Sequence, residues 1–261
     1  MNLEDWQTNR TATVGHDVTV HPVPREPRLS RRGGSGTRPR RVCSEATGVS
    51  PWYGVHCGPP ESIELRLKRL FDVGGALILL VVLSPLFLLI TVLIKLASPG
   101  PAFYLQQQVG CNQRPFRMWK FRTMIVGADK QEAALRQQQS QGPFFKVKGD
   151  TRIFPLGKFL RKHSLDELPQ LINVVKGEMS LVGPRPLFDF EVEQFTDRTH
   201  FARFAMRPGL TCIWQVNGRS NTSPEDRIRY DLAYVEHWSL LLDITILLKT
   251  IPAVLKGEGA V

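Results

Sequence analysis

The stretch that decides the fold is VGGALILLVVLSPLFLLITVLI, residues Val73–Ile94, in which no side chain is charged. A straight helix needs about 20 apolar residues to cross a bilayer, so this stretch is long enough for a transmembrane span. Ser84 and Pro85 interrupt its middle. Because Pro85 has no N–H, the carbonyl of Val81 loses its helical donor and the helix bends. We expect the Ser84 hydroxyl to satisfy part of the freed backbone.

The charges on both sides of this stretch favour a second topology. Basic residues lie close to both of its ends: Arg66, Lys68 and Arg69 before it, and Lys95, Arg114, Arg117, Lys120 and Arg122 after it. Basic flanks stay on the cytoplasmic side of a membrane, so two of them are typical of a hairpin that enters and leaves by one face. From the residues alone, a spanning helix and a re-entrant helix both remain open.

The composition narrows the class of partner without choosing one. The chain has 261 residues and a formal net charge of +10, which favours nucleic acid, anionic lipid or phosphorylated substrates. Its cysteines form no C-x-x-C pair: Cys43, Cys57, Cys111 and Cys212. This spacing argues against a zinc site or a disulfide scaffold and is typical of a reducing compartment.

The chain divides into three parts. Residues 1–61 are rich in Pro, Gly, Ser and Arg, and Ser30–Arg41 carries five arginines and no acid. We expect this part to be a disordered basic tail, either solvated or attracted to an anionic membrane surface. Residues 62–97 form the hydrophobic helix, and residues 98–261 form the remaining domain.

The domain at residues 98–261 is predicted to be α+β and mostly helical. Strands are expected at 102–109 and 116–124, and helices at 156–162, 165–176 and 227–238, the second of them ending at Gly177. Residues 129–141 are polar and fit a helix or a mobile loop. Residues 240–255 are apolar but interrupted by Asp243, Lys249 and Pro252, which fits an interfacial helix or a buried terminal helix.

The stretch HSLDELP, residues His163–Pro169, places two acids side by side. Ser164 and Glu167 have the spacing of a capping box, and the apolar residues that follow fall on one helical face: Leu165, Leu168, Ile172 and Val175. Asp166 and Glu167 then need be no more than helix-start acids. Alternatively, an ionised Asp166 among phosphate-binding cations is a competent nucleophile toward phosphorus, with Mg²⁺ as the natural metal.

At these residues the chain resembles the monotopic phosphoglycosyl transferases, bacterial sugar-phosphate transferases that begin polysaccharide and glycoconjugate assembly. The motifs that carry the resemblance run in order over about residues 64–257. They are KRLFD (Lys68–Asp72), Ser84-Pro85, KFRTM (Lys120–Met124), SLDELPQ (Ser164–Gln170), Asn173-Val174, KGEMSLVGPRP (Lys176–Pro186), RPGLT (Arg207–Thr211), QVNGR (Gln215–Arg219), Tyr230-Asp231 and Tyr234-Val235.

The resemblance implies a reaction. A hexose-1-phosphate passes from a UDP-sugar to undecaprenyl phosphate, releasing UMP, as the first membrane step of exopolysaccharide or glycoconjugate synthesis. Asp166 matches the nucleophile of the family's Asp-Glu dyad and would carry a covalent phosphosugar. Mg²⁺ is the implied cofactor with Asp166 as its ligand, and Glu167 assists the metal or a proton.

The resemblance also implies a topology and further site residues. The hydrophobic helix would be re-entrant, with both termini cytoplasmic, a small catalytic domain on the cytoplasmic face of the inner membrane, and amphipathic helices in the interface. The residues expected to bind substrate or phosphate are Lys120, Arg122, Arg161, Arg185 and Arg219, each of which could otherwise be an ordinary surface charge or structural ion pair. Asp231 could be a helix residue paired with Arg227. Where the family usually has Gly, this chain has Cys212, which puts the local loop conformation in question.

Two rival functions remain open from the sequence. One is a membrane-tethered protein that binds anionic lipid or nucleic acid without catalysis, although the resemblance leads us to expect no nucleic acid. The other is a magnesium phosphatase with an Asp nucleophile. The sugar also stays open among glucose, galactose and N-acetylated sugars. The approach to KFRTM through Arg114-Pro115-Phe116 resembles exopolysaccharide-type members and favours UDP-glucose or UDP-galactose.

Overall fold

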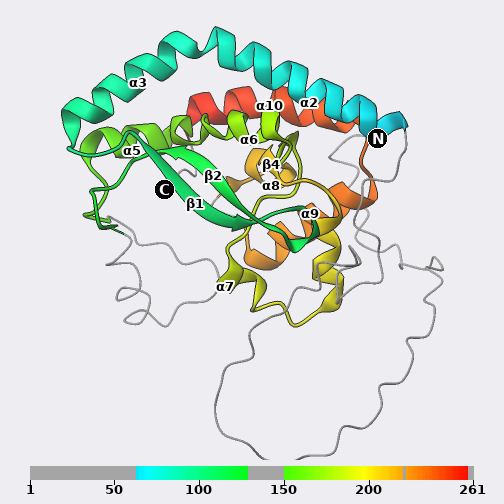
Figure 1. Ribbon diagram of the computed structural model, residues 1–261. Helices are drawn as coiled ribbons and strands as arrows, with labels where there is room; N and C mark the ends of the chain where they lie inside the picture. The colour runs from blue at the N-terminus through cyan, green and yellow to red at the C-terminus, as the bar shows by residue number, and fades with distance from the viewer. Residues whose placement is uncertain (1–62, 129–149, 220–221, 258–261) are drawn as a thin grey trace, which may run out of the picture. The chain divides into compact units, whose positions relative to one another are not determined.

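The computed structural model describes residues 63–128, 150–219 and 222–257 (Figure 1). The predictions of a disordered tail at 1–61 and of a helix or loop at 129–141 lie outside these residues.

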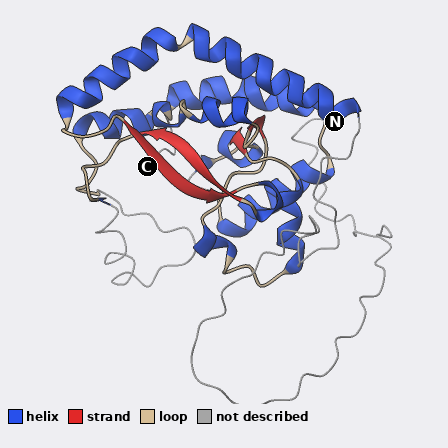
Figure 2. Cartoon of the chain, viewed as in Figure 1, coloured by secondary structure: helices blue, strands red, loops and turns tan. Residues whose placement is uncertain are grey.

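Helices dominate the described chain, and the strands are short (Figure 2). The helices are α2 (Ile63–Val82), α3 (Ser84–Ala97), α5 (Pro155–Lys162), α6 (Gln170–Lys176), α7 (Asp189–Val192), α8 (Ile213–Val216), α9 (Pro224–Glu236) and α10 (Leu240–Lys256). The strands are β1 (Phe103–Val109), β2 (Pro115–Phe121), β3 (Ser180–Val182) and β4 (Gly209–Thr211), and 3-10 helices cover Cys111–Gln113, Leu165–Glu167 and Arg198–Ala205. The prediction of a mixed and mostly helical fold is confirmed.

The hydrophobic stretch forms two helices that meet at a sharp bend. The axes of α2 and α3 differ by 61° across the break at Leu83. At the break, the Ser84 hydroxyl donates to the Val81 carbonyl at 2.8 Å, as expected from the missing N–H of Pro85. Among the described helices, none is alone long and apolar enough to cross a bilayer, whereas the bent pair meets that condition together.

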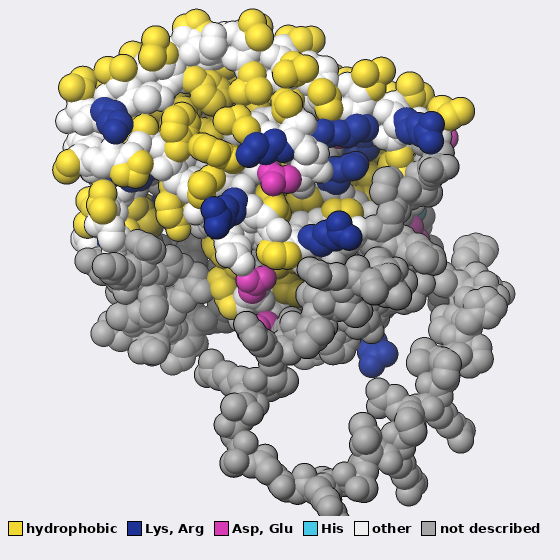
Figure 3. Space-filling view, viewed as in Figure 1, with side chains coloured by type: hydrophobic (Ala, Val, Ile, Leu, Met, Phe, Trp, Pro, Cys, Tyr) yellow, Lys and Arg dark blue, Asp and Glu magenta, His cyan; other side chains and the backbone are white. Residues whose placement is uncertain are grey.

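Large apolar side chains are exposed on α2, α3 and α10. On the bent pair they include Leu77, Ile78, Val81, Val82, Leu88, Leu89 and Leu96, and on α10 they include Leu241, Leu248, Ile251 and Leu255. Figure 3 shows apolar side chains gathered along the edge of the molecule that Figure 1 assigns to α2 and α3. An apolar surface this extensive marks a site of contact with a membrane or another protein.

The strands β1 and β2 form an antiparallel hairpin with one polar face. Its register pairs Tyr104 with Lys120, Gln106 with Met118 and Gln108 with Phe116. Because side chains alternate along a strand, Tyr104, Gln106 and Gln108 share one face with the side chains paired to them. The hairpin is fixed to α6 through Asn173, which accepts from the Trp119 amide at 2.9 Å and donates to the Arg117 carbonyl at 2.7 Å.

The parallel strands β3 and β4 approach each other closely at two glycines, Gly183 and Gly209. A Cβ on Gly209 would lie 2.1 Å from the Gly183 nitrogen, so only glycine allows this approach. The strand then leads into Cys212, which is buried with φ −149 and ψ 170. Because any residue adopts this extended conformation, Cys212 needs no glycine-specific backbone angle. The cysteine therefore fits the loop conformation without strain.

The predicted continuous helix over 165–176 is wrong. Residues Leu165–Glu167 form a 3-10 turn, and α6 begins only at Gln170. Pro169 supplies no N–H to the Leu165 carbonyl, so a continuous α-helix would lose a hydrogen bond here, and α6 starts just after the proline instead. The capping box is absent too, because Ser164 has a left-handed φ of 53 and its side chain makes no capping bond. Because the helix starts later than expected, its buried apolar residues are Leu171 and Val174 in place of the expected Ile172 and Val175.

A buried polar cluster fastens α2 to the rest of the domain. Lys68 on α2 lies 2.6 Å from the Asp243 carboxylate on α10, and it also donates to the Val182 carbonyl at 3.1 Å. Tyr234 and Trp238 donate to the same carboxylate at 2.7 and 3.2 Å. Asp243 therefore interrupts an apolar helix because that face is packed inside the domain, and α10 is partly buried and partly exposed.

We predict that Asp243→Ala lowers the free energy of unfolding by about 3 kcal/mol, because it removes the nearer counter-charge of the buried Lys68 ammonium and leaves it facing Asp72 at 3.8 Å. The measurement is denaturant unfolding of the detergent-solubilised protein. Arg229→Ala is the matched control, because it breaks the exposed Arg229–Asp226 pair and should cost no more than about 1 kcal/mol. Equal losses in the two variants would show that the Lys68–Asp243 pair does not fasten the helix.

Candidate active site

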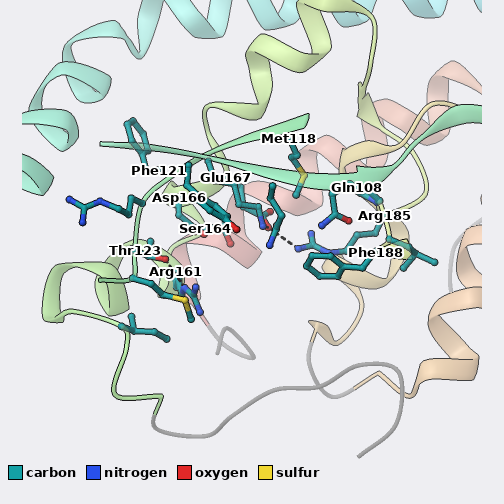
Figure 4. Close-up of a pocket in the computed structure, with 18 of the residues that line it drawn as sticks. Gln108, Met118, Phe121, Thr123, Arg161, Ser164, Asp166, Glu167, Arg185 and Phe188 are labelled. Carbon is teal, nitrogen blue, oxygen red and sulfur yellow. Dashed lines mark hydrogen bonds and ion pairs between the residues drawn. The ribbon is translucent and has the colours of Figure 1, made fainter. Parts of the chain in front are cut away.

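A pocket of about 580 Å³ lies under the polar face of the β1–β2 hairpin. Tyr104, Gln106, Gln108, Met118 and Lys120 all line it, as the strand alternation requires. The opposite walls come from the Asp166–Glu167 turn, from the segment that follows β3, and from α8 and α9. The close-up in Figure 4 shows both carboxylates directed into this space.

The turn that carries the two acids is held from both sides. It follows α5, which packs so closely on the preceding strand segment that a Cβ on Gly157 would lie 2.2 Å from the Thr123 carbonyl oxygen. It precedes α6, which is bonded to the hairpin through Asn173. The acids therefore sit in a short 3-10 turn with fixed ends, and the expected contribution of an α-helix N-terminus does not apply.

Glu167 is paired with cations. Its carboxylate lies 2.8 Å from Nη2 of Arg185 and 3.8 Å from Nζ of Lys120. Burial opposes ionisation, but the Arg185 and Lys120 charges outweigh it and lower the pKa of Glu167 to about 2. Glu167 is therefore ionised at neutral pH and neutralises the cations beside it.

Asp166 has the opposite electrostatic environment. It is 9% exposed, and burial together with the negative charge of Glu167 raises its pKa, against the attraction of Lys120 and Arg161. Neighbouring carboxyl groups whose pKa values are pushed apart are typical of catalytic pairs with distinct tasks. The cations near Asp166 therefore do not fully offset the effects that disfavour its ionised form, and further positive charge would lower its pKa.

Four of the five predicted phosphate-binding residues surround this pair. Lys120 and Arg185 contact Glu167, and burial is the main cause that lowers the pKa of Lys120, against the pull of Glu167. Arg219 donates to the Ser164 hydroxyl at 3.1 Å, two residues before Asp166 in the chain. Arg161 donates to the Thr123 hydroxyl at 2.9 Å and lines the same pocket.

Arg122 has a different environment. Its guanidinium donates to the Pro101 carbonyl at 2.6 Å, to the Ser98 hydroxyl at 3.0 Å and to the Ser98 carbonyl at 2.7 Å. These bonds fix the segment that leaves α3 against the end of β2. The structure gives Arg122 this anchoring task, and its predicted contact with phosphate stays a prediction.

A buried ion pair that the sequence did not reveal holds Arg185 in place. Asp231 pairs with Arg203 and not, as expected, with Arg227. The Arg203 guanidinium also donates to the Arg185 carbonyl at 2.6 Å. Burial raises the pKa of Asp231 to about 6 despite Arg203. The only sequence signal was the Tyr230-Asp231 motif, since Arg203 and Asp231 are far apart in the chain.

The residues present fit Mg²⁺ only in part. Among the described residues, no group of three or more His, Cys, Asp or Glu side chains could hold a metal ion. Mg²⁺ is usually held by one or two carboxylates completed by substrate phosphates and waters, and Asp166 and Glu167 supply that much. The raised pKa of Asp166 is also what a nearby cation would relieve.

Known proteins are similar in sequence to this chain over nearly all of the described region. Residues 63–257 match the model of the family described as bacterial sugar transferase. The exopolysaccharide production protein ExoY of Sinorhizobium fredii is 43% identical over 201 residues, which cover 74% of this chain and 87% of that protein.

Two further relatives carry names that state a reaction. The UDP-glucose:undecaprenyl-phosphate glucose-1-phosphate transferase of Caulobacter vibrioides is 40% identical over 209 residues, 77% of this chain and 74% of that protein. The undecaprenyl-phosphate galactose phosphotransferase of Salmonella typhimurium is 40% identical over 202 residues, 74% of this chain and 41% of that protein. The match spans the bent helix pair, the acidic turn and its cations, and the chain therefore belongs to the bacterial sugar transferases, the phosphoglycosyl transferase family that its motifs resemble.

Proposed function

We propose that this protein transfers a hexose-1-phosphate from a UDP-sugar to undecaprenyl phosphate, giving undecaprenyl-diphosphate-sugar and UMP, in exopolysaccharide synthesis. The names of the relatives from Caulobacter vibrioides and Salmonella typhimurium support the acceptor and the class of reaction. The observation that carries the proposal is the charge pattern of the pocket. Asp166 lies with its pKa raised beside a cation-paired Glu167, where an anionic phosphorus group would be neutralised.

The first step uses Asp166 as the nucleophile. A carboxylate oxygen of Asp166 attacks the sugar-bearing phosphorus of the donor, an O–P bond to Asp166 forms, and the bond from that phosphorus to the bridging oxygen breaks. UMP leaves with the electron pair, so no proton is transferred. Lys120, Arg185 and Arg219 would stabilise the charge that develops on the phosphate oxygens.

The second step regenerates the carboxylate. A phosphate oxygen of undecaprenyl phosphate attacks the same phosphorus, the bond to Asp166 breaks, and the diphosphate of the lipid product is formed. Dividing the transfer into two displacements lets one nucleophile meet a soluble donor and a membrane-bound acceptor in turn.

Asp166, with Glu167 beside it, would hold Mg²⁺ together with the donor phosphates. The ion would supply charge neutralisation for the anionic donor and the leaving UMP. The pairing of Glu167 with Arg185 and Lys120 leaves Asp166 as the carboxylate available for this role.

We predict that Asp166→Asn abolishes both products, because an amide cannot form the ester to phosphorus. Purified protein is incubated with UDP-hexose, Mg²⁺ and undecaprenyl phosphate, and UMP and lipid diphosphate sugar are quantified. Turnover should fall by a factor on the order of 10³ or more. Asp189→Asn, at an exposed acid outside the pocket, should retain wild-type turnover.

Two further incubations of the same assay distinguish the rival mechanisms. Without lipid acceptor, mass spectrometry should find a hexose-phosphate adduct on the peptide that contains Asp166, and EDTA in place of Mg²⁺ should suppress it. Free sugar phosphate without lipid product would indicate a phosphatase. An unchanged rate in Asp166→Asn would refute the covalent mechanism.

We further propose that α2 and α3 form a re-entrant hairpin on the cytoplasmic face of the inner membrane, with both termini cytoplasmic. Both ends of the pair are bonded into one domain: Lys68 to Asp243 at the start, and Ser98 to Arg122 at the end. A hydrocarbon core is about 30 Å thick, so a straight crossing would put these two ends on opposite sides of it. The exposed apolar side chains of α10 would then lie in the interface.

Tags at Met1 and Val261 should both be inaccessible to reagents outside intact cells, because both ends of the hairpin return to one face. Pro85→Leu restores the missing N–H and should expose only one terminus, whereas Leu88→Ala, on the same helix without a backbone change, should leave both protected. External labelling of Met1 in the unaltered protein would contradict the re-entrant hairpin.

A further inference from the structure

The pocket continues past the two carboxylates into a second arm, which we call the hairpin arm and define by Gln108, Phe188 and Trp214. In Figure 4, Gln108 and Phe188 lie beside Arg185, on the other side of Asp166 and Glu167 from Thr123 and Arg161. Trp214 belongs to the same end, because its ring centroid lies 5.7 Å from the Arg185 guanidinium carbon.

Two buried polar atoms in the hairpin arm have no hydrogen-bond partner. Oε1 of Gln108 and Nε1 of Trp214 are unpaired, and these side chains are 2% and 9% exposed. An unpaired buried polar atom costs about 1–3 kcal/mol, so native proteins rarely keep one without a reason. A ligand with complementary groups would satisfy both atoms.

The position of Gln108 fits the end of a nucleotide. Lys120, beside the catalytic pair, is opposite Tyr104, and Gln108 lies four residues further along the same face of β1. At about 3.3 Å per residue this is about 13 Å, comparable with the span from the outer phosphorus of a nucleoside diphosphate to the edge of its base. Arg185 lies between the two ends, where a diphosphate would need a cation.

We propose that the hairpin arm binds the nucleobase of the donor and that the Gln108 amide reads the imide edge of uracil; this rests on the function proposed above. Uracil presents an N3–H donor flanked by two carbonyl acceptors. The Gln108 amide offers an acceptor and a donor side by side, and rotation of its terminal torsion turns either one toward the pocket. The Trp214 N–H supplies a donor for a carbonyl, and the Phe188 ring supplies a face for stacking.

The arrangement makes Gln108 a specificity-determining residue. The Oε1 atom accepts from N3–H, so a base without that hydrogen leaves the oxygen buried and unpaired. Sites built around such a bond reject analogues that lack it, because the desolvated partner on the protein is left behind. The arm therefore selects uridine nucleotides by the base and not only by the phosphates.

The test measures binding of UMP and of 3-methyluridine 5′-monophosphate to the full-length protein in detergent by titration calorimetry. The methyl group removes the N3–H and changes no phosphate contact. In the wild type we expect UMP to bind roughly tenfold more tightly, the loss expected for one buried hydrogen bond. In Gln108→Leu the ratio of the two dissociation constants should fall to near one.

The neighbouring residue gives a matched control. Gln107 is exposed on the opposite face of the same strand and does not line the pocket, so Gln107→Leu should keep the wild-type ratio. Gln108→Glu, which keeps an acceptor, should still bind UMP more tightly than the methylated analogue, and it serves as a second variant if Gln108→Leu does not fold.

The outcomes separate this proposal from the one it rests on. If lipid product forms but the wild type does not distinguish the two nucleotides, or Gln108→Leu keeps the wild-type ratio, the base site is wrong and the transferase stands. If discrimination depends on Gln108 but no lipid product forms, the uridine site stands and the transferase assignment fails.

Discussion

The structure depends on a buried charge pair between the apolar helix α2 and the helix α10 near the other end of the chain. Lys68 and Asp243 lie 2.6 Å apart, and Asp243 is fully buried. The pair also receives hydrogen bonds from Tyr234 and Trp238, so each charge is compensated by several partners. Because β3 meets the same cluster through the Val182 carbonyl, this pair is the buried centre of the contacts that hold the apolar helix against the domain that carries the acidic turn.

In the pocket, too, buried charges are compensated by neighbouring groups, but Asp166 and Glu167 are compensated to different degrees. The cations beside Glu167 lower its pKa, while burial and the charge of Glu167 raise the pKa of Asp166, so two adjacent carboxyl groups differ in their tendency to ionise. The Arg203–Asp231 pair contributes to this balance, since Arg203 donates to the carbonyl of Arg185, the residue that pairs with Glu167. One cation of the pocket, Arg185, is thus positioned by a second buried charge pair.

The sequence predicted most of the fold because its strongest signals are local. The hydrophobic stretch and its proline predicted the bend with its Ser84 bond, and the two strands expected at 102–109 and 116–124 lie within a few residues of β1 and β2. The acidic turn was misread because Ser164 and Glu167 have capping-box spacing, while Pro169 decides that the helix starts later. The partner of Asp231 and the anchoring bonds of Arg122 depend on tertiary contacts, which no periodicity records. Gln108 could have been found from strand alternation, because it lies on the same face as the residues paired with Met118 and Lys120.

The bonds made by α2 have a consequence for how the molecule is divided. Arg69 donates to the carbonyls of Val174 and Val175 at the end of α6, and Asp72 accepts from the Leu181 amide. These groups belong to the domain that carries the acidic turn, yet their partners lie on the first turns of the apolar helix α2. A truncation that removes the apolar helices to obtain a water-soluble fragment would also remove Arg69 and Asp72, and with them the hydrogen bonds they make to Val174, Val175 and Leu181. We therefore expect the apolar helix α2 and the domain beneath it to fold as one unit.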